Sequence, residues 1–501
     1  MSKGQQEREV KLAVPPSFRL PPLTDPGGGV FEGTPETLEL DARYYDTSDL
    51  RLARAGALLR HRSDEGWTVK LPGHSGDADA LTRDEHHFEG DASKPPDAAL
   101  DLVRALLRTA TVKPVARLHT VRRRVPIHGA DGTPVAEVVD DRVEVVEGAT
   151  FEQTFREVEV ELAATASADQ RTALLARLRA ASAGNVDPTP KIVRALGPRA
   201  TAAADVEVPT VGRGSRLETV VQAAIAACVV KLIAHDPGVR LGGDAEDVHQ
   251  ARVATRRLRS HLRTFRPLVD ERWANDLRDE LRWLADVLGA VRDADVLLER
   301  LEHKVALVPL VDQASAEKLL DQLRSDLERR RSQLITALRG NRYLSLLDRL
   351  VLAARRPRLL LRIDGKPDAD VLRGLVRRPW EHLEGAVAAL PNDAPGAALH
   401  NIRIRAKRAR YAAEAVEPAF GKPARAYARA ITELQDVLGE HQDAVIAAEW
   451  LRATATRTND VPVAFAAGEL AGLERHDVLV SRDAWSAAWK QASRRRLREW
   501  M

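Results

Sequence analysis

Residues 7–11 read EREVK and residues 157–161 read EVEVE, and both segments alternate between two kinds of side chain. Successive side chains of a β-strand point to opposite faces of the sheet. Glu7, Glu9 and Lys11 therefore share one face of the first segment, and Glu157, Glu159 and Glu161 share one face of the second, opposite Val158 and Val160. We predict that both segments are strands with one concentrated charged face.

The same alternation recurs from Glu7 to about Lys191, between spacers rich in Gly, Pro and Asp. Roughly six to eight such strands predict an antiparallel sheet closed into a barrel. Arg60 and Arg62 share a strand face, and so do Glu137 and Asp141, with Asp140 opposite. If the apolar faces pack outward under helices, the charged faces line a polar interior that can hold a ligand.

A change of period marks the second half of the chain. Residues 198–215 are aperiodic and rich in small residues and proline, and from there to Met501 the apolar residues recur with helical spacing. We therefore predict a two-domain α+β protein, with residues 1–200 as a β domain, 201–215 as a linker and 216–501 as an all-α domain.

The two halves of the chain differ in the sign of their net charge, and the cysteine content excludes an internal disulfide and a zinc site of the CxxC type. The 501 residues hold 76 Lys and Arg against 73 Asp and Glu, but residues 1–200 hold 27 against 31 and residues 201–501 hold 49 against 42. The single Cys228 cannot form an internal disulfide, and no CxxC motif indicates zinc. Because no signal-peptide pattern and no long uncharged apolar run occurs, we expect a cytoplasmic protein without a membrane partner.

The helical half contains an internal repeat. Residues 284–296 (LADVLGAVRDADV) match residues 434–446 (LQDVLGEHQDAVI) at an offset of 150, and the block from His249 matches the block from His400 at an offset of 151. Two blocks at nearly one offset predict two helical bundles related by a pseudo-twofold axis.

Each histidine-led block carries a basic stripe. The stripe residues fall within an arc of roughly 80° on a helix: His249, Arg252, Arg256 and Arg259 in the first, extended by Arg263, and His400, Arg403, Lys407 and Arg410 in the second. Like charges at this spacing repel one another. Two explanations remain open: pairing with Asp286, Asp293, Asp436 and Asp443, or a groove that binds a polyanion.

With these residues in hand, the chain resembles two known families over nearly its whole length. The first half resembles the CYTH domain, the triphosphate tunnel metalloenzyme family, through EREVK as its ExExK signature. The accompanying motifs are YYDT at Tyr44, LRHR ending at Arg62, WTVK ending at Lys70, AEVVDD at Ala136, EVEVE at Glu157 and the late Lys191. The second half resembles the CHAD domain, the conserved histidine α-helical domain, through its paired basic helices and DVLG blocks.

The CYTH resemblance implies a closed eight-stranded antiparallel β-tunnel with flanking helices that binds and hydrolyses a linear triphosphate. The candidate phosphate ligands are Lys11, Arg60, Arg62, Lys70, Arg122 and Lys191. The candidate ligands for Mg²⁺ or Mn²⁺ are Glu7, Glu9, Asp141, Glu159 and Glu161, with Asp141 preferred to Asp140. Glu9 is also the candidate catalytic residue, which would position the attacking water.

The CHAD resemblance implies that the basic helices bind inorganic polyphosphate without catalysis. We therefore expect an enzyme, a metal-dependent triphosphatase acting on inorganic triphosphate, joined to a polyphosphate-binding module and associated with polyphosphate granules. The alternatives are a nucleoside triphosphatase or adenylate cyclase, a non-catalytic polyphosphate scaffold, and a nucleic-acid binder. The last is disfavoured because few aromatic residues accompany the basic ones.

Overall fold

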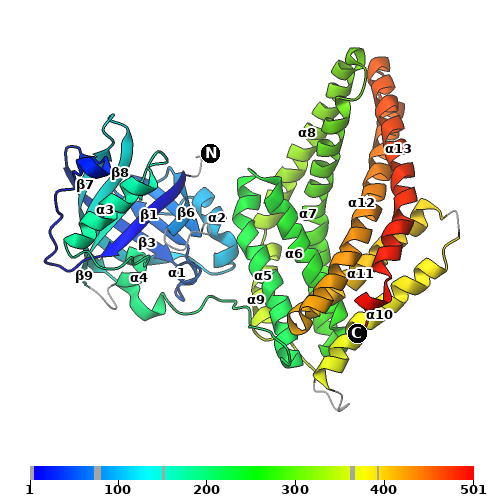
Figure 1. The fold of residues 1–501 in the computed structure, drawn as a ribbon, viewed down its shortest axis with the longest axis horizontal. Helices are drawn as coiled ribbons and strands as arrows, with labels where there is room; N and C mark the ends of the chain where they lie inside the picture. Colours follow the sequence, from blue (N-terminus) through cyan, green and yellow to red (C-terminus); the bar gives the residue numbers. More distant parts are fainter. Residues whose placement is uncertain (1–4, 73–80, 149–152, 361–366, 392–393) are drawn as a thin grey trace. The chain divides into compact units, whose positions relative to one another are not determined.

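The computed structural model of the chain separates into two units, residues 1–205 and residues 206–501. It describes residues 5–72, 81–148, 153–360, 367–391 and 394–501, with the backbone alone at residues 5–8, 26 and 81–83. Figure 1 shows the strands in the first unit and long helices in the second. The predicted two-domain α+β fold is confirmed.

One antiparallel sheet dominates the first unit. Its described strands are β1 (Gln5–Ala13), β2 (Phe31–Glu32), β3 (Glu36–Asp46), β4 (Leu58–Arg62), β5 (Gly66–Pro72), β6 (Leu81–Phe88), β7 (Lys113–His128), β8 (Pro134–Glu147) and β9 (Thr154–Leu162). They are ordered β2–β7–β3–β4–β5–β6–β1–β9–β8, and β7 also pairs with β8. The short β2 pairs with β7, which also pairs with β3. The pairing of β7 with β8 closes the other eight strands into a ring.

The register of the ring brings charged side chains together on its inner face. Lys11 on β1 lies opposite Glu159 on β9, and Glu9 lies opposite Glu161. On the next strand, Glu137 of β8 also lies opposite Glu161. Like charges directly opposite each other destabilise a sheet. The three glutamates therefore need a nearby cation.

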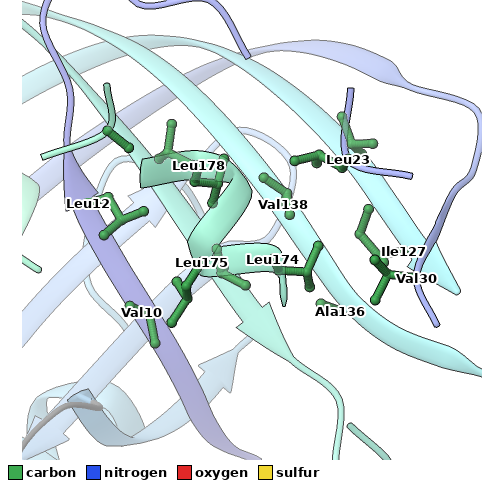
Figure 2. Close-up of a cluster of buried hydrophobic side chains, with 14 of the residues drawn as sticks. Val10, Leu12, Leu23, Val30, Ile127, Ala136, Val138, Leu174, Leu175 and Leu178 are labelled. Atoms are coloured by element: carbon green, nitrogen blue, oxygen red, sulfur yellow. The ribbon is translucent and has the colours of Figure 1, made fainter. Parts of the chain in front are cut away.

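The apolar outer face packs under helix α3 (Ala168–Ala180), which begins with a capping box between Ser167 and Gln170. Figure 2 shows Leu174, Leu175 and Leu178 of this helix against the strands. Their apolar partners in the same buried cluster include Val10 and Leu12 on β1, Ile127 on β7, and Ala136 and Val138 on β8. This packing leaves the charged face of the strands to line the interior.

Three shorter helices complete the first unit: α1 (Arg51–Arg54), α2 (Asp97–Leu107) and α4 (Lys191–Leu196). Helix α1 is held by the buried Asp46, whose carboxylate accepts hydrogen bonds from the backbone of Leu52 and Ala53 at 2.9 and 3.0 Å. Helix α4 starts at Lys191, directly after Pro190. The helix start therefore sets the position of the Lys191 side chain.

Nine helices form the described part of the second unit. They are α5 (Leu217–Leu241), α6 (Ala245–Thr264), α7 (Glu271–Val305), α8 (Leu310–Arg339), α9 (Asn341–Arg355), α10 (Asp368–Ala388), α11 (Gly396–Phe420), α12 (Lys422–Arg457) and α13 (Val461–Ala492). Helices α5 to α8 each start 151 residues before α10 to α13, so the sequence repeat is a repeat of four helices. Helices α6 and α11, which carry the basic stripes, pack on each other.

Helix α5 is long and apolar enough to cross a membrane by length and composition alone. Half of its most apolar window is buried inside the protein, as in the core helix of a folded domain, so this single helix is weak evidence for a membrane span.

Truncating the α3 core tests how the ring is covered. Leu178 is fully buried, so Leu178→Ala should lower the free energy of unfolding by about 2–5 kcal/mol. Arg179→Ala, at the exposed neighbouring position, should change it by no more than about 0.5 kcal/mol. Chemical denaturation of both variants measures the difference, and equal stabilities would contradict the packing described here.

Candidate functional site

The ring encloses a cavity of about 170 Å³ with a strongly charged lining. Its cations are Lys11, Arg60, Arg62, Lys70, Arg122, Arg124 and Lys191, and its carboxylates are Glu9, Asp64, Glu65, Glu85, Glu137, Glu159 and Glu161. All six cations that the sequence suggested as phosphate ligands lie in this lining. Strands on all sides of the ring contribute, so closure of the sheet is what gathers them.

At one end of the cavity, two lysines share buried carboxylates. The Lys11 Nζ atom lies 2.6 Å from Glu159 and 3.6 Å from Glu9. The Lys191 Nζ atom lies 2.6 Å from Glu157, 2.8 Å from Glu159 and 3.0 Å from Asp141. Lys191 reaches this position from the start of α4, outside the sheet, so the strands alone do not complete the cluster.

The electrostatic balance differs between the two buried glutamates. Burial alone would raise the pKa of Glu159, but Lys11, Lys191 and Arg122 outweigh it and hold that pKa well below the usual value. Burial raises the pKa of Glu157 in spite of Lys191 and Lys11. Glu159 is thus the carboxylate held in its ionised form, as a metal ligand must be.

Asp141 and Asp140 point in opposite directions. Asp141 is fully buried and accepts two hydrogen bonds from Arg122, at 2.9 and 2.7 Å. Asp140 instead binds Arg156, which also donates to the carbonyl of Pro16. Asp141 is therefore the aspartate that contacts the tunnel cations, and it lies behind them rather than in the cavity lining.

Three groups of described side chains could hold a metal ion. In the group of Asp141, Glu157 and Glu159, the ammonium of Lys191 already contacts all three carboxylates. Cations also contact the group of Glu65, Glu85 and His87, as described below. Lysines also contact the third group, Glu9, Glu159 and Glu161, but it is the one of these three groups whose members all line the cavity. A hard divalent cation held there could therefore also reach phosphate oxygens. The side chain of Glu7 lies outside the described residues.

The sequence did not single out several residues of this site. Glu157 was placed on the charged face with Glu159 but not among the candidate ligands, and it is almost completely buried. Glu85 and Arg124 lie on strands β6 and β7 and could have been found in the same way. Asp64 and Glu65 lie in the turn between β4 and β5, where no period exists to place them.

The second unit brings its two basic stripes together. Arg256 on α6 lowers the pKa of both Arg403 and Lys407 on α11, although burial is the largest cause in each case. Arg403 in turn contributes to a lowered pKa at Arg252, again after burial. Such mutual effects require the stripes to face one another across the packed pair of helices.

The leading arginines of the stripes occupy equivalent places in the two repeats. The nearest side-chain atom to a Cβ built on Gly289 belongs to Arg252, at 3.4 Å, and the nearest to a Cβ on Gly439 belongs to Arg403, at 3.5 Å. The glycine of each DVLG block therefore leaves room for one arginine of the preceding helix. Arg252 also pairs with Asp293 at 2.9 Å.

Acidic pairing explains only part of the stripes. Arg252 has Asp293, and Arg410 lies 3.4 Å from Glu414 on its own helix. Within the described part of the chain no carboxylate forms an ion pair with Lys407. His400 is hydrogen-bonded to Gln442 at 2.7 Å. Among the described residues, His249 has no side-chain hydrogen bond, and its pKa is lowered by burial and then by Arg292.

Further arginines extend the basic surface beyond the predicted stripes. Arg263, at the end of the first stripe, has its pKa lowered by burial and then by Arg408 and Arg259. Burial and Arg263 do the same to Arg278 on α7. Arg278 and Arg408 join the surface through helix packing, which the stripe spacing alone did not reveal.

Lys407 gives a pH test of this uncompensated charge. Burial and the facing arginines lower its pKa to about 6, whereas the unfolded chain restores the ordinary lysine value. Between about pH 6 and the ordinary lysine pKa of 10.5, unfolding therefore takes up a proton. The cost to the folded protein is complete below about pH 6 and declines as pH rises from there toward the ordinary lysine pKa. Lys407→Met should raise the melting temperature of the full chain by a few degrees, more at pH 6.5 than at pH 9.

Thermal unfolding at both pH values measures this difference. The control is Lys318→Met on α8, where the lysine is 59% exposed and pairs with Asp460 at 2.9 Å. A destabilised Lys407→Met variant, or a gain that does not depend on pH, would contradict the charge penalty.

Comparison with known proteins agrees with both units. The CYTH domain family matches residues 5–186, and the CHAD domain family matches residues 223–452. The uncharacterized protein Rv2226 of Mycobacterium tuberculosis is 34% identical over 445 residues, which cover 84% of this chain and 83% of that protein.

Two solved structures are also similar, each 27% identical with a TM-score of 0.47. They are PptA from Streptomyces chartreusis, matched over 55% of this chain and 100% of its own, and the CHAD domain from the plant Ricinus communis, matched over 58% and 96%. With the two family matches and the relative from Mycobacterium tuberculosis, this chain belongs to the proteins that join a CYTH domain to a CHAD domain.

Proposed function

We propose that the first unit is a divalent-metal-dependent triphosphatase that hydrolyses inorganic triphosphate, and that the second unit binds inorganic polyphosphate. Members of the CYTH family are triphosphatases or cyclases, so triphosphate chemistry is the common ground. The observation that supports the proposal most directly is the narrow cavity in which seven cations face seven carboxylates. Its predominantly charged lining suits the charged oxygens of a linear phosphate chain.

The roles of the tunnel residues follow from their chemistry. The arginines can grip phosphate oxygens with two parallel hydrogen bonds, and Lys11 and Lys191 act as point charges. Glu9, Glu159 and Glu161 would hold Mg²⁺ or Mn²⁺, which would neutralise charge on the phosphate oxygens. Glu9 is also our candidate for orienting the attacking water. Phosphoryl transfer depends mainly on positioning and charge neutralisation, so the site needs no covalent nucleophile.

Removing charge from the proposed metal ligands tests the catalytic part. Glu9→Gln and Glu161→Gln should each lower kcat for triphosphate by about 10²-fold or more, because each removes a metal ligand. Glu39→Gln is the matched control, since Glu39 is an exposed strand glutamate outside the cavity lining. Phosphate release with Mg²⁺ and with Mn²⁺ measures the effect.

The same assay should include ATP. Faster turnover of ATP than of triphosphate, or formation of cyclic AMP, would replace our first choice with a nucleotide-directed activity. Unchanged turnover in both variants would remove the proposed metal role.

Binding of long polyphosphate should depend on the facing stripes. Arg256→Ala combined with Arg403→Ala should weaken binding by about 10-fold or more and reduce the slope of log affinity against log salt by about two, since two phosphate contacts are lost. Lys318→Ala with Arg324→Ala, two cations on α8 with exposed side chains, should change neither quantity. Equal competition by single-stranded DNA at physiological salt would contradict a polyphosphate preference.

A further inference from the structure

The turn between β4 and β5 places two carboxylates on two of the proposed phosphate ligands. Glu65 lies 2.9 Å from the Nη2 atom of Arg60. Asp64 accepts hydrogen bonds from Arg62 at 2.6 and 3.1 Å, and Glu65 also contacts Arg62. Both carboxylates line the cavity. Asp64 and Glu65 therefore occupy positions on the guanidinium groups that phosphate oxygens would take.

These carboxylates differ from the acidic groups at the other end of the cavity. The side chains of Asp64 and Glu65 are 37% and 33% exposed, whereas those of Glu157 and Glu159 are 1% and 4% exposed. Asp64 and Glu65 lie in a short turn that closes at Gly66, whose φ of 74° favours glycine. Rotation toward solvent rehydrates an exposed carboxylate, while a buried one has no such exit.

The arginines beneath the turn are themselves well buried, and one of them has an unpaired donor. Arg60 and Arg62 are 8% and 7% exposed. The Nε atom of Arg60 is buried without a hydrogen-bond partner. Buried donors are rarely left unpaired, and such a donor in a charged cavity indicates a ligand that is not part of the chain. The acidic turn thus neutralises both arginines but leaves the Nε donor of Arg60 unpaired.

The contacts of these carboxylates fit a counter-ion role better than a metal site, since His87 of the candidate metal group does not line the cavity. Glu65, Glu85 and His87 lie close enough together to bind a metal ion. However, Lys70 lies 2.9 Å from Glu85, and Arg60 lies 2.9 Å from Glu65 and 3.7 Å from Glu85. A divalent cation would have to compete with both side chains. The group therefore serves as a set of counter-ions for the tunnel cations.

We propose that Asp64 and Glu65 form an exchangeable counter-ion gate, which the phosphate chain displaces from Arg60 and Arg62 as it enters the tunnel. The inference rests on the proposed triphosphatase function and identifies the turn as the element that sets substrate affinity. Every binding event must break the ion pairs of the turn before the arginines can grip phosphate. The gate weakens substrate binding, balances the charge of Arg60 and Arg62, and leaves the carboxylates around Lys11 untouched.

The test is the double variant Asp64→Asn/Glu65→Gln, which keeps the shape of both side chains. We expect the KM for triphosphate to fall about five- to tenfold, with kcat changed less than about twofold, because two partly exposed ion pairs no longer compete. The Kd for triphosphate, measured by calorimetry with a chelator in place of metal, should fall by the same factor. The single variant Glu65→Gln should give a smaller change in the same direction.

A matched control removes two carboxylates from an arginine outside the tunnel. Asp41 and Glu147 lie 3.2 and 3.9 Å from Arg117, which does not line the cavity. Asp41→Asn/Glu147→Gln alters net charge equally and should leave KM and Kd unchanged. In an Arg60→Ala/Arg62→Ala background, Asp64→Asn/Glu65→Gln should have no further effect on Kd, because the ion pairs between the turn and these arginines are already absent.

The outcomes separate the gate from the function on which it rests. A wild-type protein that binds and hydrolyses triphosphate, with unchanged KM and Kd in the turn variant, overturns the gate alone. An equal gain in the Arg117 control reduces the effect to net charge and also overturns it. A wild-type protein that neither binds nor hydrolyses triphosphate overturns the proposed function together with the gate.

Discussion

The first unit depends on the burial of charge inside a closed ring of strands. Once the ring closes, every second side chain must point inward, and α3 covers the apolar outer face. Charged groups in such an interior are tolerated only in pairs with good geometry. Lys11, Lys191 and Arg122 meet this condition against Glu159 and Asp141, so the cluster that holds the interior together is also the one that faces a ligand.

The second unit handles charge in the opposite way. Its stripes on α6 and α11 gather positive charges with few carboxylates among them. Lys407 has no carboxylate within ion-pair distance among the described residues. Burial and neighbouring arginines depress the pKa of Lys407 instead. The tunnel cations are paired with carboxylates of the same chain, whereas under the proposed function a polyphosphate would supply the counter-charge for the stripes.

Strand alternation predicted the β domain and charged faces that include Glu9, Lys11 and Arg60, because in a closed ring the period decides which side chains face inward. Lys70, Arg122 and Lys191 were named through the resemblance to the CYTH domain, and Lys191 lies on α4, where no strand period applies. Alternation also placed Glu157 on the charged face beside Glu159, although Glu157 was not among the candidate ligands. Asp64 and Glu65 could not be placed, since a turn has no period. Arg278 and Arg408 join the basic surface only through the packing of α7 and α11, which the sequence of one helix does not encode.

The two helical repeats differ in charge at one pair of equivalent positions. Arg263 in the first repeat corresponds to Glu414 in the second, and Glu414 pairs with Arg257 at 2.9 Å and lies 3.4 Å from Arg410. A symmetric homodimer must present the same residue at both ends of a shared surface. Because both copies here belong to one chain, each could change independently, and the basic surface has acquired two unlike ends.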